Sequence, residues 1–242
     1  MARRIALAEG LSARDHDILR MMGEFGGKTF VEVLARTFWH GRKVPEQQAR
    51  DRIQRLKKNY KLLRLVQTGL MKPRNAIALT DFGKRWVKSE TDIEVGQLFL
   101  SPVTIWHTVN EAIAWYWLRQ AGRDVSRTIV KRWSKAHHHT PDLLYFHGGD
   151  KTKPVYVEIE MHPKPTDRMI GIFKKMERDS VYAVLYIYEN EKRMKQYGRR
   201  LPTYDRVYLT NIDDLIRNVS EIGKVAALRQ IDFVKKYKGE WK

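Results

Sequence analysis

The sequence predicts an α+β protein with two units, a mainly helical unit over residues 1–90 and an α/β unit with a small mixed sheet over residues 101–242. At 242 residues the chain exceeds the usual size of a single domain. The first part repeats apolar residues at helical spacing, whereas the second alternates extended and helical segments. Residues 89–101 interrupt both patterns, so we expect the junction between the units there.

The composition indicates a folded protein that binds a polyanion. Hydrophobic residues make up 43% of the chain, well above the content of a disordered protein. There are 46 Lys and Arg against 28 Asp and Glu, with a net charge of +18. The excess is greatest in residues 1–90, which hold 20 basic and 9 acidic residues. Such a balance is typical of proteins that bind phosphate backbones, and charge alone leaves a ribosome-associated or merely soluble basic protein open.

The absence of cysteine excludes disulfides and thiolate metal sites and fits a reducing compartment, so we expect the protein in the cytoplasm. The first residues contain no apolar run long enough for a signal peptide. No segment approaches the roughly 20 apolar residues of a membrane span. We therefore expect neither export through such a signal nor a transmembrane segment.

The N-terminal unit begins with three predicted helices. Ser12 and Asp15 form a capping-box pattern, which predicts a helix from Ser12 to about residue 24. A pair of glycines ends it, and apolar residues at helical spacing predict a second helix over residues 30–38. After a short turn over residues 41–44, Pro45 suits the first turn of a third helix.

The third helix has two different faces. Ala49, Ile53, Leu56 and Tyr60 fall on one stripe, which predicts its buried side. The remaining positions carry side chains that can reach base edges and phosphates, namely Gln47, Gln48, Asp51, Arg52, Gln54, Arg55 and Lys58. A charged helix face in contact with solvent alone is the alternative interpretation.

A basic hairpin is predicted to follow this helix. Residues 63–70 and 75–80 have the pattern of two strands, joined by a tip that contains Lys72 and Arg74. Thr80 is the expected cap of a fourth helix. Helix, helix, tight turn, basic helix and basic hairpin together predict a winged helix-turn-helix that binds double-stranded DNA. We expect its DNA contacts to come from Gln47, Gln48, Arg52, Arg55, Lys58, Lys72 and Arg74.

The second unit is predicted to begin with an aromatic-rich helix over residues 105–122. Extended segments are expected at residues 128–133, 142–146, 154–160 and 181–188, with a basic helix at about residues 171–180 before the last of them. Alternating helices and strands then continue to a C-terminal helix, which is typical of an α/β unit.

Three carboxylates in this unit are candidate metal ligands. Glu158 and Glu160 lie two residues apart on one predicted strand and therefore share a face. Asp142 heads the preceding strand, so all three can converge and offer the oxygen ligands that Mg²⁺ or Mn²⁺ prefers. Such an ion could activate water for phosphodiester cleavage. In the alternative interpretation both glutamates lie on the solvent-exposed face of an ordinary amphipathic strand.

These residues resemble the core of PD-(D/E)xK nucleases. Pro141-Asp142 followed by Glu158-Ile159-Glu160 matches the pattern in which Asp and Glu bind Mg²⁺ and a lysine two residues after the Glu orients the attacking water. This chain has Glu160 at the lysine position. The resemblance therefore implies either a site that has lost its lysine or one in which Lys174 or Lys175 of the next helix replaces it.

A longer stretch resembles the replication-relaxation family of plasmids and conjugative elements. Its members place a winged helix before a His-x-x-Asn helix and a nuclease-like segment, and here His107, Asn110, Asp142, Glu158 and Lys174 follow that order. The resemblance implies a role in plasmid mobilisation or replication initiation, as a metal-dependent DNA-nicking endonuclease or as its DNA-binding helper. It also implies relaxosome or replication proteins as partners. A non-catalytic DNA-binding regulator is the alternative, and a homodimer stays open.

The three consecutive histidines before Pro141 also suggest a transition-metal site. On an extended segment successive side chains point to opposite faces, so only His137 and His139 could bind one ion together. We expect these residues to be polar loop residues instead.

Overall fold

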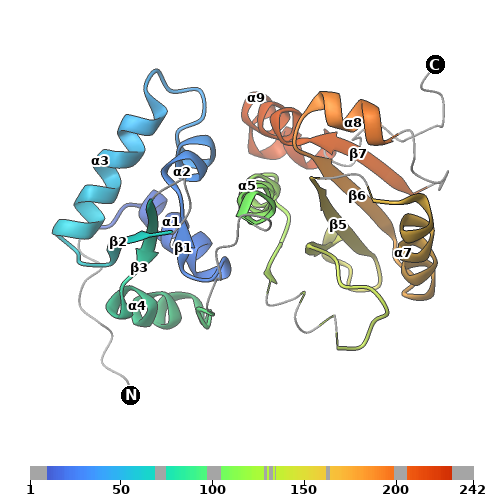
Figure 1. Ribbon diagram of the computed structural model, residues 1–242, viewed down its shortest axis with the longest axis horizontal. Coiled ribbons are helices and arrows are strands. Elements are labelled where there is room, and N and C mark those ends of the chain that lie inside the picture. Colours follow the sequence, from blue (N-terminus) through green and yellow to red (C-terminus); the bar gives the residue numbers. More distant parts are fainter. Residues whose placement is uncertain are drawn as a thin grey trace. The chain divides into compact units, whose positions relative to one another are not determined.

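The computed structural model describes residues 10–68, 75–96, 105–127, 130, 133, 135–161, 164–198 and 206–230. It is a mixed α and β structure with two small sheets (Figure 1). The chain divides into two compact units, Met1–Ala112 and Ile113–Lys242. The division falls inside helix α5 (Ile105–Gln120), later in the chain than the junction expected at residues 89–101.

In the first unit, helices α1 (Ala13–Glu24), α2 (Val31–Phe38), α3 (Pro45–Lys58) and α4 (Asp81–Thr91) pack with an antiparallel sheet. Strand order is β1 (Lys28–Thr29), β3 (Asn75–Leu79), β2 (Leu63–Gln67). The predicted helices and hairpin strands are present, whereas the two-residue β1 was not expected, because so short a strand has no period. The hairpin tip with Lys72 and Arg74 lies outside the described residues.

The predicted helix caps are confirmed. Ser12 accepts a hydrogen bond from the backbone amide of Asp15, whose carboxylate in turn accepts one from the Ser12 amide, so the capping box is complete. Thr80 accepts a hydrogen bond from the Gly83 amide at 3.0 Å and caps α4. Pro45 occupies the first turn of α3, and Ala49, Ile53 and Leu56 of the predicted stripe are buried as expected. Tyr60, the fourth residue of that stripe, lies beyond the end of the helix and is only half-buried.

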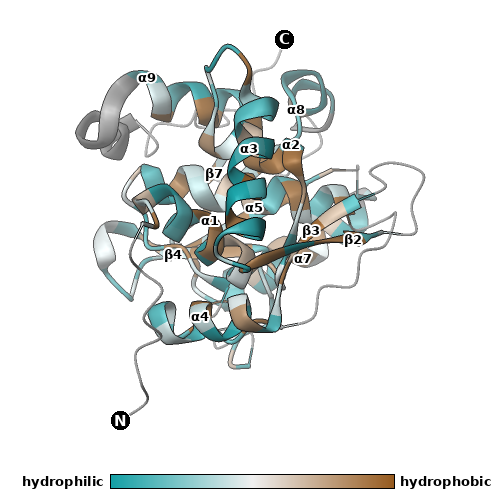
Figure 2. Cartoon of the chain, turned by 90° about the vertical axis from the view of Figure 1, so that its left-hand side faces the viewer, coloured by the Kyte–Doolittle hydropathy of each residue, from teal (hydrophilic) through white to brown (hydrophobic). Residues whose placement is uncertain are grey.

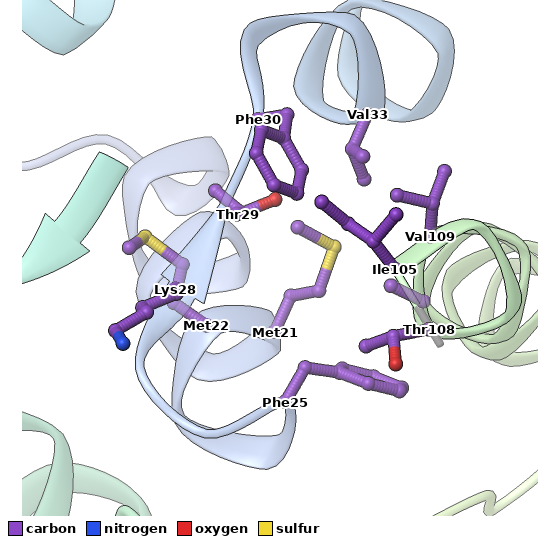
Figure 3. Close-up of a pocket in the computed structure, with 11 residues that line it drawn as sticks. Met21, Met22, Phe25, Lys28, Thr29, Phe30, Val33, Ile105, Thr108 and Val109 are labelled. Carbon is purple, nitrogen blue, oxygen red and sulfur yellow. The ribbon is translucent and has the colours of Figure 1, made fainter. Parts of the chain in front are cut away.

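The core of the first unit extends into α5. A small pocket in this unit is lined by apolar side chains of α1, β1 and α2 and of the first half of α5 (Figure 3). Ile105 and Val109 of α5 face Met21 of α1 and Phe25, which caps the end of α1, across it. These contacts explain why the first unit ends within α5. The lining is too apolar to suggest a catalytic role.

In the second unit, the sheet order is β4 (Leu143–Phe146), β5 (Pro154–Glu160), β6 (Ala183–Tyr188), β7 (Val207–Asn211). The pair β4–β5 is antiparallel, and β5, β6 and β7 run parallel. Parallel neighbours need crossover connections, which here contain α7 (Thr166–Arg178) and α8 (Glu191–Gly198). Helix α9 (Ile212–Gln230) follows β7. The small mixed sheet predicted for this unit is therefore confirmed.

One face of this sheet buries an aromatic and methionine-rich core. Tyr156, Tyr186 and Tyr188 of the sheet pack with Phe173 and Met176 of α7 in one cluster. One predicted strand of this unit is wrong: Val130 and Trp133, which lie in the segment expected to be extended, are helical. Both pack on the core cluster, so tertiary contacts have overridden the strand propensity of this segment.

Gly83 allows α4 to approach the chain before β2 closely. A Cβ atom at this position would overlap the carbonyl oxygen of Leu62, which belongs to the backbone and cannot rotate away. We expect Gly83→Ala to lower the free energy of unfolding by about 1–3 kcal/mol in chemical denaturation. Gly171 inside α7 is a matched control, because a Cβ there meets nothing within 4 Å. Gly171→Ala should raise stability by up to about 1 kcal/mol, and equal stabilities of the two variants would contradict the close approach.

Candidate functional sites

The first candidate site is an exposed basic surface on α3 and β2. Arg55, Lys58, Lys61 and Arg64 are all exposed, and we call these four residues the basic face. In Figure 2 the α3 ribbon is predominantly hydrophilic. Because Ile53 and Leu56 are buried on the other side of α3, the helix holds its basic side chains outward. This arrangement supplies positive charge on a rigid element.

The expected DNA-contacting residues of α3 have different environments. Gln47 is exposed, and its amide nitrogen donates a hydrogen bond to Asp51 at 2.8 Å, which orients the amide group. Gln48 is only half-buried and lies on the same first turns. Arg55 and Lys58 are exposed. These four residues remain available for contact with a ligand.

Arg52 is the exception among the predicted DNA contacts. Its guanidinium group forms a two-pronged ion pair with Asp15 of α1, whose side chain is completely buried. Partial burial lowers the pKa of Arg52, and the neighbouring charge of Arg55 acts in the same direction. Asp15 also accepts hydrogen bonds from the Ser12 amide at 2.6 Å and from the Ser12 hydroxyl at 2.7 Å. Arg52 therefore joins α3 to the capped end of α1 and is not directed toward a ligand.

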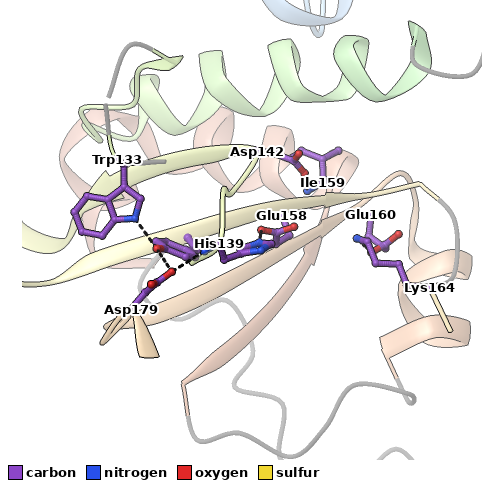
Figure 4. A network of polar contacts seen from close by, with 9 residues as sticks. Trp133, His139, Asp142, Glu158, Ile159, Glu160, Lys164 and Asp179 are labelled. Carbon is purple, nitrogen blue, oxygen red and sulfur yellow. Dashed lines mark hydrogen bonds and ion pairs between the residues drawn. The ribbon is translucent and has the colours of Figure 1, made fainter. Parts of the chain in front are cut away.

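The second candidate site lies on β5 and immediately before β4, and it contains the three predicted carboxylates. We call Asp142, Glu158 and Glu160 the carboxylate centre (Figure 4). All seven residues of β5 are buried, and Glu158 and Glu160 are each only 5% exposed. The alternative of two glutamates on a solvent-exposed strand face is therefore wrong. Their burial needs compensation, since an unpaired buried charge is strongly destabilising.

Each carboxylate of the centre has a partner within the protein. Asp142 accepts a hydrogen bond from the Ile159 backbone amide at 2.7 Å. The Glu158 carboxylate lies 2.8 Å from Nε2 of His139. Glu160 lies 2.5 Å from Nζ of Lys164. Burial raises the pKa of Glu158, and its contact with His139 opposes this effect.

A tyrosine adds an unsatisfied hydroxyl to the centre. Tyr186 of β6 pairs with Glu158 of β5, so that both side chains lie on the same face of the sheet. Its side chain is buried, and within the described residues its hydroxyl has no hydrogen-bond partner. Burial raises the pKa of Tyr186, and the charges of Glu158 and Glu160 add to this effect. The hydroxyl is thus a buried donor close to two carboxylates.

The lysines expected at this centre lie elsewhere. Lys174 and Lys175 are exposed on α7, whose buried side is formed by Phe173 and Met176. The lysine in contact with a carboxylate is Lys164, which precedes α7 and which the sequence interpretation did not select. Lys164 lies four residues after Glu160 in the sequence. This spacing would have predicted their contact only if the chain was known to turn back after β5.

A second polar network fixes the histidine segment beside the centre. Asp179 accepts hydrogen bonds from the backbone amides of His138 at 2.8 Å and His139 at 3.0 Å, and from the hydroxyl of Tyr156 at 3.0 Å (Figure 4). That hydroxyl also accepts a hydrogen bond from the indole of Trp133. The network determines where His139 lies relative to Glu158. Sequence interpretation missed Asp179, because its contacts join segments about 40 residues apart, and it considered His139 only as a metal ligand together with His137.

Asp179 gives this network a testable dependence on pH. Burial would raise its pKa, but hydrogen bonds from the two backbone amides and from Tyr156 outweigh it and hold the pKa below its usual value. A lowered pKa means that Asp179 stabilises the fold above about pH 4 and that this contribution is lost as the pH falls through the folded-state pKa. We expect Asp179→Asn to lower the free energy of unfolding at neutral pH by about 1.5–3 kcal/mol.

The difference between wild type and Asp179→Asn should shrink in denaturation experiments as the pH is lowered from about 5 to 2. The exposed Glu177 on α7 offers a control, and Glu177→Gln should leave this pH dependence unchanged. A stability difference for Asp179→Asn that stays constant over this range would show that the hydrogen bonds do not depend on its charge.

The centre does not fit a divalent ion as it is folded. Across the described ranges, no three His, Asp or Glu side chains are grouped so that they could hold a metal ion. Glu158 and Glu160 are occupied by His139 and Lys164 instead of pointing at one shared point. His137, the other histidine considered as a metal ligand, stacks on Trp133 with ring centroids 3.5 Å apart. Asn110 of the His-x-x-Asn pattern donates to the Trp106 carbonyl within α5.

Comparisons with known proteins give no match: no family model matches the chain, and no curated protein or solved structure is detectably similar to it. In the part of the chain that the structure describes, no helix has the length and apolar character that a membrane crossing requires.

Proposed function

We propose that the protein binds double-stranded DNA through α3 and the adjoining β2–β3 hairpin, as a winged helix-turn-helix does. The observation that carries the proposal is the basic face. Its four members are all exposed, and the opposite side of α3 is packed into the core through Ile53 and Leu56. A helix presented in this way can enter a major groove, and a hairpin beside it can contact the backbone. The net charge of +18 adds long-range attraction to a polyanion.

The side chains of α3 suggest a division of roles. Lys58, Lys61 and Arg64 would contact phosphates and position the protein on the duplex. Arg55 and the amides of Gln47 and Gln48 would contact base edges, since Arg pairs well with guanine and Gln with adenine. Arg52 has a different role in this proposal, because its guanidinium is already bound to Asp15. Lys72 and Arg74 at the hairpin tip remain predicted backbone contacts.

The test is the double variant Arg55→Ala/Lys58→Ala in a fluorescence-anisotropy titration with mixed-sequence duplex DNA. We expect affinity to fall by about ten- to a hundredfold, the loss typical of removing a base contact and a phosphate contact. The double variant Lys84→Ala/Lys88→Ala on α4 removes the same charge from a helix with no proposed DNA contact, and it should bind nearly as wild type. Equal losses in the two variants would mean that net charge alone, and not α3, determines binding.

A role in plasmid mobilisation or replication initiation is part of the proposal and is supported by the motif order described above. Under it, the protein would bind near an origin together with relaxosome or replication proteins. Selection of bound fragments from a fragmented plasmid tests this role. Enrichment of one origin-proximal fragment over the remainder supports it, and uniform recovery of all fragments contradicts it.

Cation-dependent nicking at the carboxylate centre is a second candidate function. One observation favours it: Glu158 and Glu160 are buried on the same face of the sheet as the Tyr186 hydroxyl, which has no hydrogen-bond partner among the described residues. Supercoiled plasmid incubated with protein and Mg²⁺ or Mn²⁺ tests it, with Asp142→Ala as the control. Open circles formed by the wild type alone support nicking. No conversion favours the alternative of a non-catalytic DNA-binding regulator or relaxosome accessory protein.

A further inference from the structure

We propose that helix α7 of the second unit is a further DNA-binding surface, which holds the phosphate backbone of a duplex through four basic side chains grouped around Gly171. Arg168, Lys174, Lys175 and Arg178 are exposed on this helix, and we call them together with Gly171 the α7 surface. The proposal rests on the proposed function only for the identity of the polyanion, because the α7 surface belongs to the other unit and contains no residue of α3.

The α7 surface is carried by a helix that is fixed in the core. Met169, Phe173 and Met176 on the opposite side of α7 belong to the buried core cluster of the second unit (Figure 1). At 1.5 Å of rise per residue, Arg168 and Arg178 are about 15 Å apart along the helix axis, which matches about four nucleotides of a DNA strand. A rigid helix thus presents a row of cations on the scale of a backbone segment.

The protein leaves the charges of the α7 surface without counter-charges. Within the described ranges none of its four cations forms an ion pair, whereas Lys195 on the neighbouring helix α8 pairs with Glu191 at 2.6 Å. Lys174 and Lys175 lie four and three residues before Arg178, so like charges are neighbours on the helix, which is unfavourable for it. A bound polyanion would relieve this repulsion.

Two members of the α7 surface do not favour the helix itself. Arg168 lies in the first turn of α7, where the positive end of the helix dipole disfavours a cation. Gly171 lies in the helix interior, where glycine is less favourable than alanine, and a Cβ atom there would meet nothing within 4 Å. Packing therefore does not require a glycine at this position.

A ligand that approaches the helix backbone closely explains both residues. Glycine leaves the space above the helix free for such an approach. Gly171 is three residues from Arg168 and from Lys174 and four from Lys175, so the cations surround this space. The arrangement suits a phosphate group, which can lie against the helix between several basic side chains.

The side chains of α7 favour a nucleic-acid backbone over a membrane surface. A helix that binds a membrane inserts an apolar face between the lipids. The apolar face of α7 is buried in the protein, and Ile170 is the one large apolar side chain exposed on the described part of this helix. Phosphates held by Lys and Arg need no apolar contact. The occupant is therefore the backbone of duplex DNA, contacted irrespective of base sequence.

The test compares Lys174→Gln/Lys175→Gln with Lys151→Gln/Lys192→Gln in fluorescence-anisotropy titrations of the full-length chain with a long mixed-sequence duplex. Each variant loses two exposed lysines of the second unit, and the second pair lies outside α7. We expect the α7 variant to lose about tenfold or more in affinity at about 100 mM salt, with a salt slope shallower by about two units, one for each lost phosphate contact. The control pair should bind nearly as wild type. Equal affinities of the two variants would overturn the proposal.

The same changes in the Arg55→Ala/Lys58→Ala background separate this proposal from DNA binding by α3. Lys174→Gln/Lys175→Gln should lower the duplex affinity of this background further, and the control pair should not. If Arg55→Ala/Lys58→Ala itself bound as wild type, the proposal for α3 would fail, and the difference between the two lysine pairs would still decide the proposal for α7.

Gly171→Gln tests the close approach without a change of charge. Glutamine is a better helix former, so the melting temperature followed by circular dichroism should rise. Duplex affinity of the same sample should fall several-fold, because the new side chain occupies the space between the cations. An unchanged affinity would overturn the close approach at Gly171.

Vesicles that contain phosphatidylserine test the membrane as the alternative occupant. We expect the wild type and Lys174→Gln/Lys175→Gln to differ in duplex binding in the way described above. A difference between them that appeared with the vesicles and not with the duplex would overturn the proposal, since α7 would then bind a lipid surface.

Discussion

Arg52→Met is expected to lower the free energy of unfolding by about 3 kcal/mol, although the neighbouring basic residues of α3 face solvent. The variant leaves the carboxylate of Asp15 buried without its cationic partner. Two hydrogen bonds from Ser12 remain, and they compensate only part of this loss. Urea denaturation followed by circular dichroism measures the change.

Arg50→Met is the matched control for Arg52→Met. Arg50 lies two residues earlier on α3 and, among the described residues, pairs with exposed Glu46 at 3.4 Å, so its replacement should change stability by less than about 0.5 kcal/mol. Replacing both partners, as in Asp15→Asn/Arg52→Met, should be less destabilising than the sum of the two single changes. If Arg52→Met kept wild-type stability and lost DNA affinity, Arg52 would contact DNA as the sequence pattern suggested.

DNA affinity is expected to fall about 10³-fold or more between roughly 50 and 200 mM salt if six or more phosphates are contacted. The reason is that each Lys or Arg bound to a phosphate releases a condensed counterion. Binding titrations at four or five salt concentrations give the slope of the logarithm of affinity against the logarithm of salt concentration. A slope near zero would exclude backbone contacts as the main source of affinity.

Variants of the hairpin tip separate the wing from α3 in the same experiment. Lys72→Ala/Arg74→Ala should weaken binding to all sequences about equally and make the slope shallower by about two units, one for each lost phosphate contact. A changed sequence preference with an unchanged slope would mean instead that the tip contacts bases.

Elements determined by local chemistry could be predicted from the sequence. The hydroxyls of Ser12 and Thr80 satisfy amide groups within three residues, and the apolar stripe of α3 repeats at helical spacing, so both features are visible in a short window. That Glu158 and Glu160 share a face could be predicted equally well, because the alternation of side chains along a strand follows from backbone geometry.

Features determined by long-range contacts could not be predicted in this way. Arg52 and Asp15 are 37 residues apart, and no spacing rule distinguishes Arg52 from the exposed Arg55 on the same helix. The partners of the carboxylate centre depend likewise on where the chain turns after β5 and on Asp179, which holds the segment containing His139. The charge pattern therefore identified some of the exposed charged residues of α3. It did not show which charged side chains are bound inside the protein.

Asp15 makes the start of α1 and the middle of α3 a single cooperative element. Its carboxylate accepts hydrogen bonds from the amide of Ser12 and from the guanidinium of Arg52 at once, so movement of α3 away from α1 would leave the capping carboxylate buried without its cation and weaken the cap. Local opening of one helix should then open the other, and amide protons in the first turn of α1 should exchange with solvent at the rate of those around Arg52. Fraying, which usually begins at helix ends, would be suppressed at this end of α1. A ligand bound to α3 would slow hydrogen exchange in α1 without touching it.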